Sequence, residues 1–207
     1  MMVERMAHGE ERAEDASLLA RAAAGDERAF RTLYDAHQRP LFRVAYGVLL
    51  DEAEAREAVQ EAFLQLHRVA PSWEPRARVC TWLYRVVLRH CLGLKQRLLR
   101  LVFAPAVVQA SARESPERGL SLSQSVQVVE RALKAMSPKQ RAVATLHLEA
   151  EASPSDIAEI LEITPNDARV TLHRALTRMR EELKRAGVDA LEDSPTFLVT
   201  IPTEEDS

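Results

Sequence analysis

Positive charge is concentrated between residues 68 and 100. This stretch holds eight Lys and Arg residues and one acid, a formal charge of +7 in a chain whose net charge is −3. Guanidinium groups attract phosphates, and the interleaved rings of Trp73, Trp82 and Tyr84 are of the kind that stack on unpaired bases. The pattern therefore indicates nucleic-acid binding by this segment. The alternative interpretation is an ordinary solvated helix face whose salt bridges the sequence does not reveal.

The two tryptophans of this segment have different expected roles. Trp82 stands at helical spacing from Val86, which favours a place in the core over a contact with a base. The stretch "PSWEPRAR" (71–78) has no helical pattern and predicts a loop whose backbone can wrap an unpaired base. Trp73 in this loop is either a stacking surface or a loop anchor, and the sequence does not decide between them.

Three short stretches have the form of a helix start. They are "SPKQ" (137–140), "SPSD" (153–156) and "TPND" (164–167). A hydroxyl at the N-cap accepts a bond from the third helical N–H, Pro fits the first helical position, and the third side chain can reach back to the cap. The sequence therefore predicts helices starting at Ser137, Ser153 and Thr164. Asp167 has a second possible role, accepting a hydrogen bond from a cytosine amino group, but the form shared with the other two starts favours the cap.

The last two of these helices are separated only by Glu162 and Ile163, which predicts a helix-turn-helix. Its expected core consists of Ile157, Ala158, Leu161, Ile163, Ala168, Val170 and Leu172. The longer helix should expose a row of basic side chains, namely Arg169, His173, Arg174, Arg178 and Arg180. A DNA-binding unit is favoured over a plain helical hairpin.

The chain as a whole predicts an all-α protein, because Ala, Leu, Arg and Glu dominate it. We expect two small helical domains joined by a flexible linker, the second containing the helix-turn-helix. The expected parts are a flexible N-terminus (1–14), a bundle of about four helices (15–101), a linker rich in Pro, Ser and Gly (102–124), a second helical domain (125–185) and an acidic disordered tail (186–207).

The composition also bears on the compartment. No long stretch lacks charges, and the charged N-terminus has none of the apolar core of a signal peptide, so we expect a cytoplasmic protein without membrane insertion. Cys80 and Cys91 are then expected to be reduced thiols. No CxxC or HxxxH spacing occurs, so no metal site is expected.

Four segments in sequence carry a resemblance to a known family. They are "GDERAFRTLYDAHQRPLFRVAYGVL" (25–49), "AREAVQEAFLQLHR" (55–68), "RVCTWLYRVVLRHCLGLKQR" (78–97) and the stretch from "LKAMSPKQ" to "REEL" (133–183). Over about residues 17–185 the chain resembles a bacterial RNA polymerase sigma factor of the extracytoplasmic-function (ECF, group-four) type. The resemblance implies a transcription initiation factor that is not an enzyme and needs no cofactor. Its implied partners are core RNA polymerase, promoter DNA and an anti-sigma factor.

The resemblance also implies three sets of binding residues. The core-polymerase set shares one helix face, at spacings i, i+3, i+4 and i+7: Glu57, Gln60, Glu61 and Leu64. The set for the minus-ten element, read while the strands part, is Trp73, Arg76, Arg78, Arg85 and Arg89. The set for the minus-thirty-five element, read as duplex, is Asn166, Arg169, Thr171, His173, Arg174 and Arg178.

Some positions depart from the family pattern. Arg89 and Gly93 stand where Asn and Asp are expected in the promoter-melting helix, and Glu162 stands at the usual glycine of the turn. Val170 and Thr171 stand where Ser and Arg are common. Two alternatives to a working sigma factor stay open, and the departures at Arg89, Gly93 and Thr171 motivate the first of them. One is a sigma-like interaction protein that holds polymerase or an anti-sigma factor without efficient promoter firing, and the other is a helix-turn-helix regulator that binds duplex DNA without polymerase.

Overall fold

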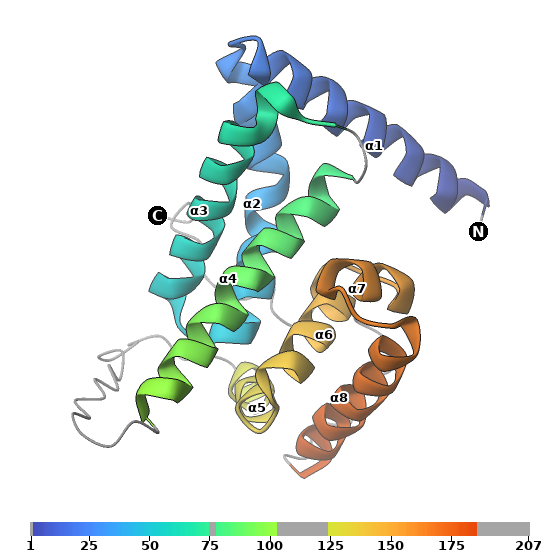
Figure 1. Ribbon diagram of the computed structural model, residues 1–207. Coiled ribbons are helices and arrows are strands. Elements are labelled where there is room, and N and C mark those ends of the chain that lie inside the picture. The colour runs from blue at the N-terminus through green and yellow to red at the C-terminus, as the bar shows by residue number, and fades with distance from the viewer. Residues whose placement is uncertain (1, 75–77, 103–123, 186–207) are drawn as a thin grey trace.

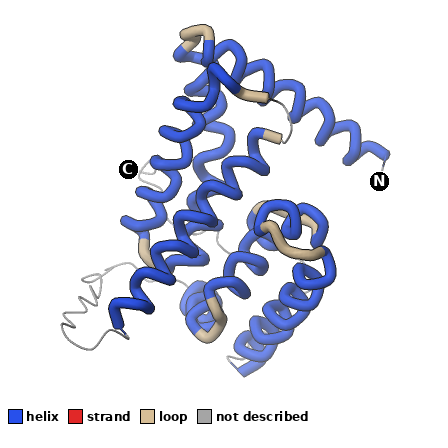
Figure 2. The backbone as a smooth tube through the Cα atoms, in the orientation of Figure 1, coloured by secondary structure: helices blue, strands red, loops and turns tan. Residues whose placement is uncertain are grey.

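The computed structural model describes the backbone of residues 2–74, 78–102 and 124–185, and the side chains within 13–74, 78–94 and 128–185. Every regular element in these ranges is a helix (Figure 2), so the all-α prediction is confirmed. An N-terminal block contains α1 (Met2–Ala23), α2 (Glu27–Leu49), α3 (Glu52–Val69), the short 3₁₀ turn η1 (Ala70–Ser72) and α4 (Val79–Val102). A C-terminal block contains α5 (Gln124–Lys134), α6 (Pro138–Glu149), α7 (Pro154–Leu161) and α8 (Pro165–Arg185). No helix in the described ranges has the length and apolar character needed to cross a membrane.

The helices of the N-terminal block begin at aspartate caps. The Asp26 carboxylate accepts hydrogen bonds from the backbone N–H groups of Arg28 and Ala29 at the start of α2. Asp51 does the same for Glu54 at the start of α3. An Asp at the N-cap satisfies donors that have no partner within the helix, and its charge suits the positive end of the helix dipole. The chain therefore turns sharply between neighbouring helices and packs them as a bundle (Figure 1).

The three predicted helix starts are all present in the C-terminal block. Ser137 with Gln140, and Ser153 with Asp156, each form a complete capping box, with both reciprocal hydrogen bonds made. At the third start, the backbone N–H of Asp167 donates to the Thr164 hydroxyl at 3.1 Å. Within the described residues, the Asp167 carboxylate makes no bond back to Thr164. This start therefore has half of the predicted cap.

The turn between α7 and α8 is left-handed at Glu162, with φ of 55°. The backbone N–H of Glu162 donates to the carbonyl of Ala158, and that of Ile163 donates to the same carbonyl at 3.0 Å. A residue with a Cβ costs about 1 kcal/mol more than glycine in this conformation. Glu162 therefore adopts the same left-handed turn that a glycine would adopt at this position, and the turn between α7 and α8 keeps its usual form.

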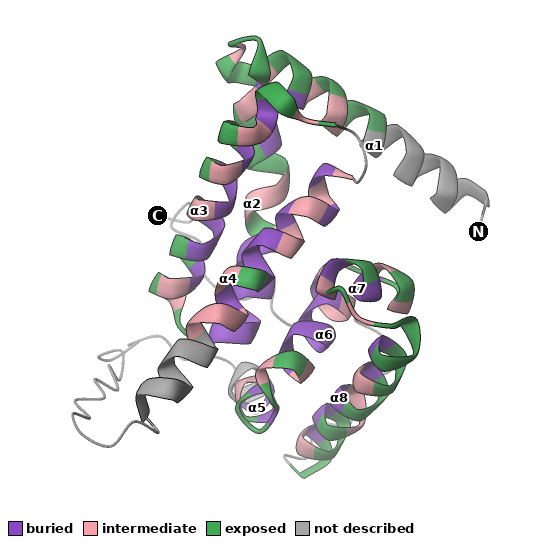
Figure 3. Ribbon diagram, in the orientation of Figure 1, coloured by how far each residue is buried: buried purple, intermediate pink, exposed green. Residues whose placement is uncertain are grey.

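The two blocks share one hydrophobic core. A single cluster of buried side chains runs from α1–α4 into α6, α7 and α8, where it includes Leu146, Ile157, Ile160 and Leu172. A smaller cluster lies between α5, α6 and α8. Helix α6 is buried on nearly every side, because it packs against α2 on one face and against α8 on another (Figure 3). The described parts of the two predicted domains are thus docked against each other.

Several expectations need correction or fall outside the described residues. Val170 was expected in the core but is 40% exposed, because it lies about 200° around α8 from Ala168 and Leu172, which are buried. Helix α1 begins at Met2, within the segment 1–14 for which the sequence predicts a flexible N-terminus. Ala, Glu, Arg and Met in this segment are good helix formers, although the segment is highly charged. The expected linker, apart from its two end residues, and the expected acidic tail lie outside the described residues.

Two glycines provide a matched test of helix propensity. A Cβ added at Gly93 or at Gly25 would meet nothing within 4 Å, but Gly93 is helical while Gly25 has φ of +95°. We expect Gly93→Ala to raise the free energy of unfolding by about 1 kcal/mol, since Ala is the better helix former. Gly25→Ala should lower it by a similar amount, because the left-handed conformation disfavours a Cβ. Urea unfolding of the full chain measures both, and equal effects at the two sites would contradict this account.

Candidate nucleic-acid interface

The exposed face of α8 carries most of the predicted minus-thirty-five residues. The buried side chains of this helix form one stripe, which consists of Ala168, Leu172, Ala175, Met179 and Leu183. The opposite side is solvent-exposed and carries Asn166, Arg169, His173, Arg174 and Arg178. Thr171 is only partly exposed and lies at the edge of this face. The arrangement leaves a row of cationic and amide groups free to approach a groove of duplex DNA.

The predicted minus-ten residues lie along the first half of α4 and before it. Arg85 and Arg89 lie on α4 and Arg78 lies directly before it, with Arg89 the most exposed of the three. Arg76 lies outside the described residues. The Trp73 ring packs edge-on against Trp82, with centroids 5.7 Å apart, and both rings contact the core. The Trp73 ring is thus partly buried against Trp82, a contact that suits a loop anchor and leaves part of the ring exposed.

The predicted polymerase face of α3 is open to solvent. Glu57, Gln60 and Leu64 are exposed, and Leu64 keeps 47% of its surface although it is a large apolar residue. Glu61 is more restrained, because Gln65 donates to its carboxylate at 3.0 Å and Arg68 lies 3.6 Å from it. These side chains line an open groove of about 450 Å³.

Two further residues line this groove and were not found from the sequence. Gln65 comes from α3, and His90 reaches the groove from α4. A helical-wheel argument on α3 could have found Gln65, which is one turn after Glu61. His90 carried no such signal, because only the packing of α4 against α3 brings it there.

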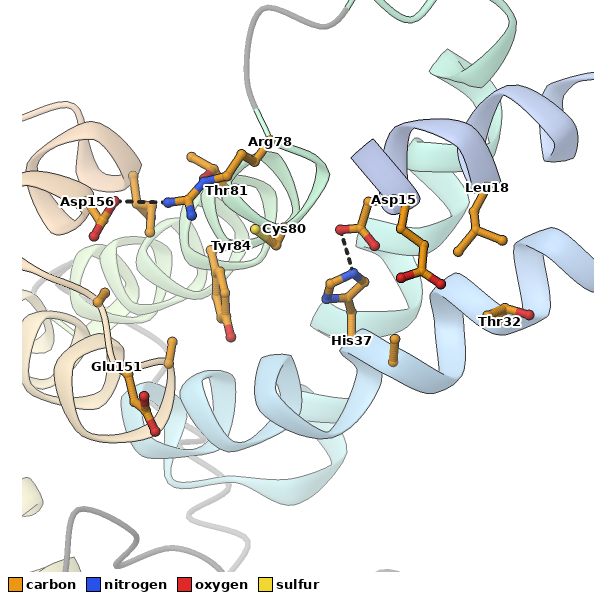
Figure 4. Close-up of a pocket in the computed structure, with 15 residues that line it drawn as sticks. Asp15, Leu18, Thr32, His37, Arg78, Cys80, Thr81, Tyr84, Glu151 and Asp156 are labelled. Atoms are coloured by element: carbon orange, nitrogen blue, oxygen red, sulfur yellow. Dashed lines mark hydrogen bonds and ion pairs between the residues drawn. The ribbon is translucent and has the colours of Figure 1, made fainter. Parts of the chain in front are cut away.

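A second cavity, of about 440 Å³, lies where α1, α2 and α4 meet the loop before α7 (Figure 4). A hydrogen bond joins His37 of α2 to Asp15 of α1 at one side of this cavity, with Nε2 and Oδ2 2.9 Å apart. Burial raises the pKa of the Cys80 thiol, and it raises the pKa of the Tyr84 hydroxyl well above its usual range. Both groups are therefore neutral at pH 7.

Comparison with known proteins bears on what these surfaces do. The model of Sigma-70 region 2 matches residues 33–99, and that of Sigma-70 region 4 matches residues 127–179. The chain is 32% identical over 165 residues to the ECF RNA polymerase sigma factor SigM of Mycobacterium tuberculosis, which covers 80% of this chain and 82% of SigM. The chain belongs to the ECF sigma factors. It is therefore a transcription initiation factor, which binds core RNA polymerase and directs promoter recognition.

Other relatives agree with this membership. The ECF sigma factor SigW of Bacillus subtilis is 24% identical over 174 residues, which covers 77% of this sigma factor and 91% of SigW. The fold is similar to that of the sigma factor RpoE of Bartonella quintana in its complex with the anti-sigma factor NepR. That likeness has a TM-score of 0.59 at 21% identity and covers 78% of this sigma factor and 98% of RpoE. The all-helical architecture of this ECF sigma factor is thus shared with a solved relative.

Proposed function

We propose that this sigma factor divides its work among three surfaces. The exposed face of α3 (Glu57, Gln60, Glu61 and Leu64) binds core polymerase. The N-terminal half of α4 with the loop before it (Trp73, Arg76, Arg78, Arg85 and Arg89) contacts the minus-ten element as the strands part. The exposed face of α8 (Asn166, Arg169, Thr171, His173, Arg174 and Arg178) reads the minus-thirty-five element. The observation that carries this proposal is that the basic side chains of α8 lie opposite its buried stripe.

The α8 surface suits duplex DNA in its details. Asn166 and Arg169 lie in the first turns of the helix, the end that enters the major groove in helix-turn-helix proteins. Arginine can donate two hydrogen bonds to a guanine, a contact that contributes about 1–3 kcal/mol of discrimination. Arg174 and Arg178 lie further along the helix, where they can bind phosphates on either side of the groove.

The α3 surface suits a protein partner. It combines carboxylates with an amide and an exposed leucine, so it can dock on a basic surface that also offers an apolar contact. An anti-sigma factor is a further proposed partner, since the sigma factor RpoE of similar fold is in complex with one. All of these roles are binding roles, so we propose that the protein catalyses no reaction, needs no cofactor and works in the cytoplasm.

The proposed function is tested by transcription in vitro. Purified sigma factor is added to core RNA polymerase on DNA selected from a randomised promoter library. Transcripts that start at one position and require the protein support the proposal. Polymerase binding without transcripts supports the sigma-like interaction protein, and DNA binding without polymerase supports the independent regulator.

Substitutions at Arg169 and at Asp167 test base recognition and helix capping separately. We expect Arg169→Ala to weaken promoter binding about 10- to 100-fold, because it removes a contact of about 1–3 kcal/mol, and to leave the melting temperature unchanged. Arg180→Ala, on the same helix but nearer its C-terminal end, is the matched control and should weaken binding much less.

Asp167→Asn should lower the melting temperature slightly and leave the preferred minus-thirty-five sequence as it is. The expected loss is small because the Asp167 carboxylate makes no side-chain bond to Thr164 and contributes only through the helix dipole. The measurement is a binding selection from randomised minus-thirty-five DNA. A changed preference at one base pair would mean that Asp167 itself contacts DNA.

A further inference from the structure

The exposed face of α8 has an apolar residue at its centre. Helix α8 buries one side and exposes the other (Figure 3). At about 100° per residue, Val170 points almost directly away from the buried stripe that contains Ala168, Leu172 and Ala175. Val170 is 40% exposed, and it is one of three large apolar residues that are exposed in the described part of the chain.

Val170 contributes little to the stability of the described part of the chain. Neither hydrophobic cluster includes it, and it is not among the partly buried side chains that pack against them. As a β-branched residue it is also a weaker helix former than Ala. Single exposed apolar residues are common, but this one is surrounded by exposed polar groups, namely Asn166, Arg169, His173 and Arg174. A valine at the centre of that set favours a contact outside the chain.

An aliphatic side chain at this place discriminates among the four bases. In the major groove, thymine presents a C5-methyl group, whereas adenine, guanine and cytosine are recognised there through hydrogen-bond donors and acceptors. Valine makes no side-chain hydrogen bond, so a polar base edge pressed against it would lose water without gaining a partner. A methyl group gains by leaving water in the same contact. Val170 therefore favours thymine both by contact and by exclusion of the other bases.

The position of Val170 along α8 fits a contact with a base. It is the sixth residue of the helix, directly after Arg169 and one turn after Asn166. In helix-turn-helix proteins the N-terminal turns of this helix approach the base edges. With a rise of 1.5 Å per residue, Asn166 and Val170 lie about 6 Å apart along the helix, close to two base-pair steps of about 3.4 Å. Val170 is thus placed to face a base pair within the element.

We propose that Val170 reads the C5-methyl group of one thymine in the minus-thirty-five element. The valine methyl groups pack against that methyl, while the flanking polar side chains bind neighbouring base edges and phosphates. The inference rests on the proposed role of α8 as the reader of this element, and it adds the base that the central position of the helix selects. A thymine at one fixed position is then a requirement of the promoters that this sigma factor uses.

The test replaces thymine by uracil, which lacks the C5-methyl group and keeps the same hydrogen-bonding groups. Holoenzyme is assembled from the full-length sigma factor and core RNA polymerase. Its affinity is measured for fluorescent duplex promoters whose minus-thirty-five element was selected from random DNA, and each thymine of that element is replaced in turn. We expect uracil to lower the affinity about fourfold at one position, the loss expected for one buried methyl group, and less than about 1.5-fold at the others.

The variant Val170→Ala assigns this effect to the side chain. It should bind the thymine promoter about fourfold more weakly than the wild type does, and it should bind the thymine and uracil promoters equally. Its melting temperature should not fall, because Val170 is exposed and Ala is the better helix former. Thr177→Ala is the matched control, since Thr177 lies seven residues further along the same face of α8. This control should keep the full effect of uracil.

The outcomes separate this inference from the proposed function. A promoter-binding holoenzyme that tolerates uracil at every thymine, or that selects no thymine in the element, would overturn the role of Val170 and leave the proposed function intact. The same conclusion would follow if Val170→Ala kept the wild-type sensitivity to uracil. A holoenzyme that binds none of the selected DNA would overturn both, because α8 would then not read a minus-thirty-five element at all.

Discussion

Replacement of both Glu57 and Glu61 by Lys is expected to abolish co-purification of the sigma factor with core RNA polymerase. Both carboxylates line the open groove on α3, and the double substitution changes its charge by four units. Like charges brought together at a protein interface cost several kcal/mol, which corresponds to an affinity loss of about a thousandfold. The measurement is a fluorescence titration of core polymerase with the labelled sigma factor, together with far-ultraviolet circular dichroism to show that the helices persist.

The control for this variant carries the same change of charge elsewhere. Asp35→Lys with Glu181→Lys alters exposed residues of α2 and α8 that lie outside the groove. This control should bind polymerase with nearly the affinity of the wild type. Polymerase binding by the Glu57/Glu61 variant at wild-type strength would show that the contact lies on another surface.

Loss of Arg43 or of Glu149 is expected to destabilise the fold strongly. Arg43 Nε of α2 lies 3.0 Å from Oε2 of Glu149 of α6, and the Glu149 side chain is only 1% exposed. Removing one partner of a buried ion pair costs about 3–5 kcal/mol, because the remaining charge stays buried and loses the attraction of the removed group. We expect Arg43→Met to approach this range. Glu149→Leu should cost less, about 2 kcal/mol, since the Arg43 side chain is 26% exposed and can reach water.

The double variant identifies the cause of that loss. Arg43→Met combined with Glu149→Leu replaces both charges by apolar side chains, which often restores most of the stability. Urea unfolding of the wild type, the two single variants and the double variant gives the coupling free energy between Arg43 and Glu149. Additive losses would mean that the two residues contribute through packing with other neighbours and not through their charges.

Local features of this fold could be predicted from the sequence. Ser137 and Ser153 start helices as expected, because an N-cap depends on residues three positions apart. Val170 was placed wrongly, since an apolar residue type was taken as a sign of burial although its position on α8 points away from Leu172. The helical spacing of Val170 from Ala168 and Leu172 would have been enough to predict that its side chain is exposed.

The docking of the two blocks could not be predicted in the same way. The sequence shows Arg78, Arg85 and Arg89 as a basic row, which could face water, nucleic acid or carboxylates. They face carboxylates because α7 packs on α4, and the sequence does not reveal that packing. Glu149 has an ordinary place at the end of a helix in sequence, yet its partner Arg43 comes from the other block. Periodicity identifies an apolar face but contains no information about which distant helix covers it.

Helix α6 gives the association of the blocks a dependence on temperature. Its Ala142, Val143 and Leu146 are completely buried in the cluster shared with the N-terminal block, so separation of the blocks would bring apolar surface into water. Exposure of apolar surface raises the heat capacity, and the free energy gained from burying it shrinks as the solution is cooled. The apolar part of the contact therefore weakens in the cold, whereas the surface ion pairs around it respond mainly to salt. Cooling should thus weaken the association of the two blocks through its apolar contact, and added salt should weaken it through the surface ion pairs.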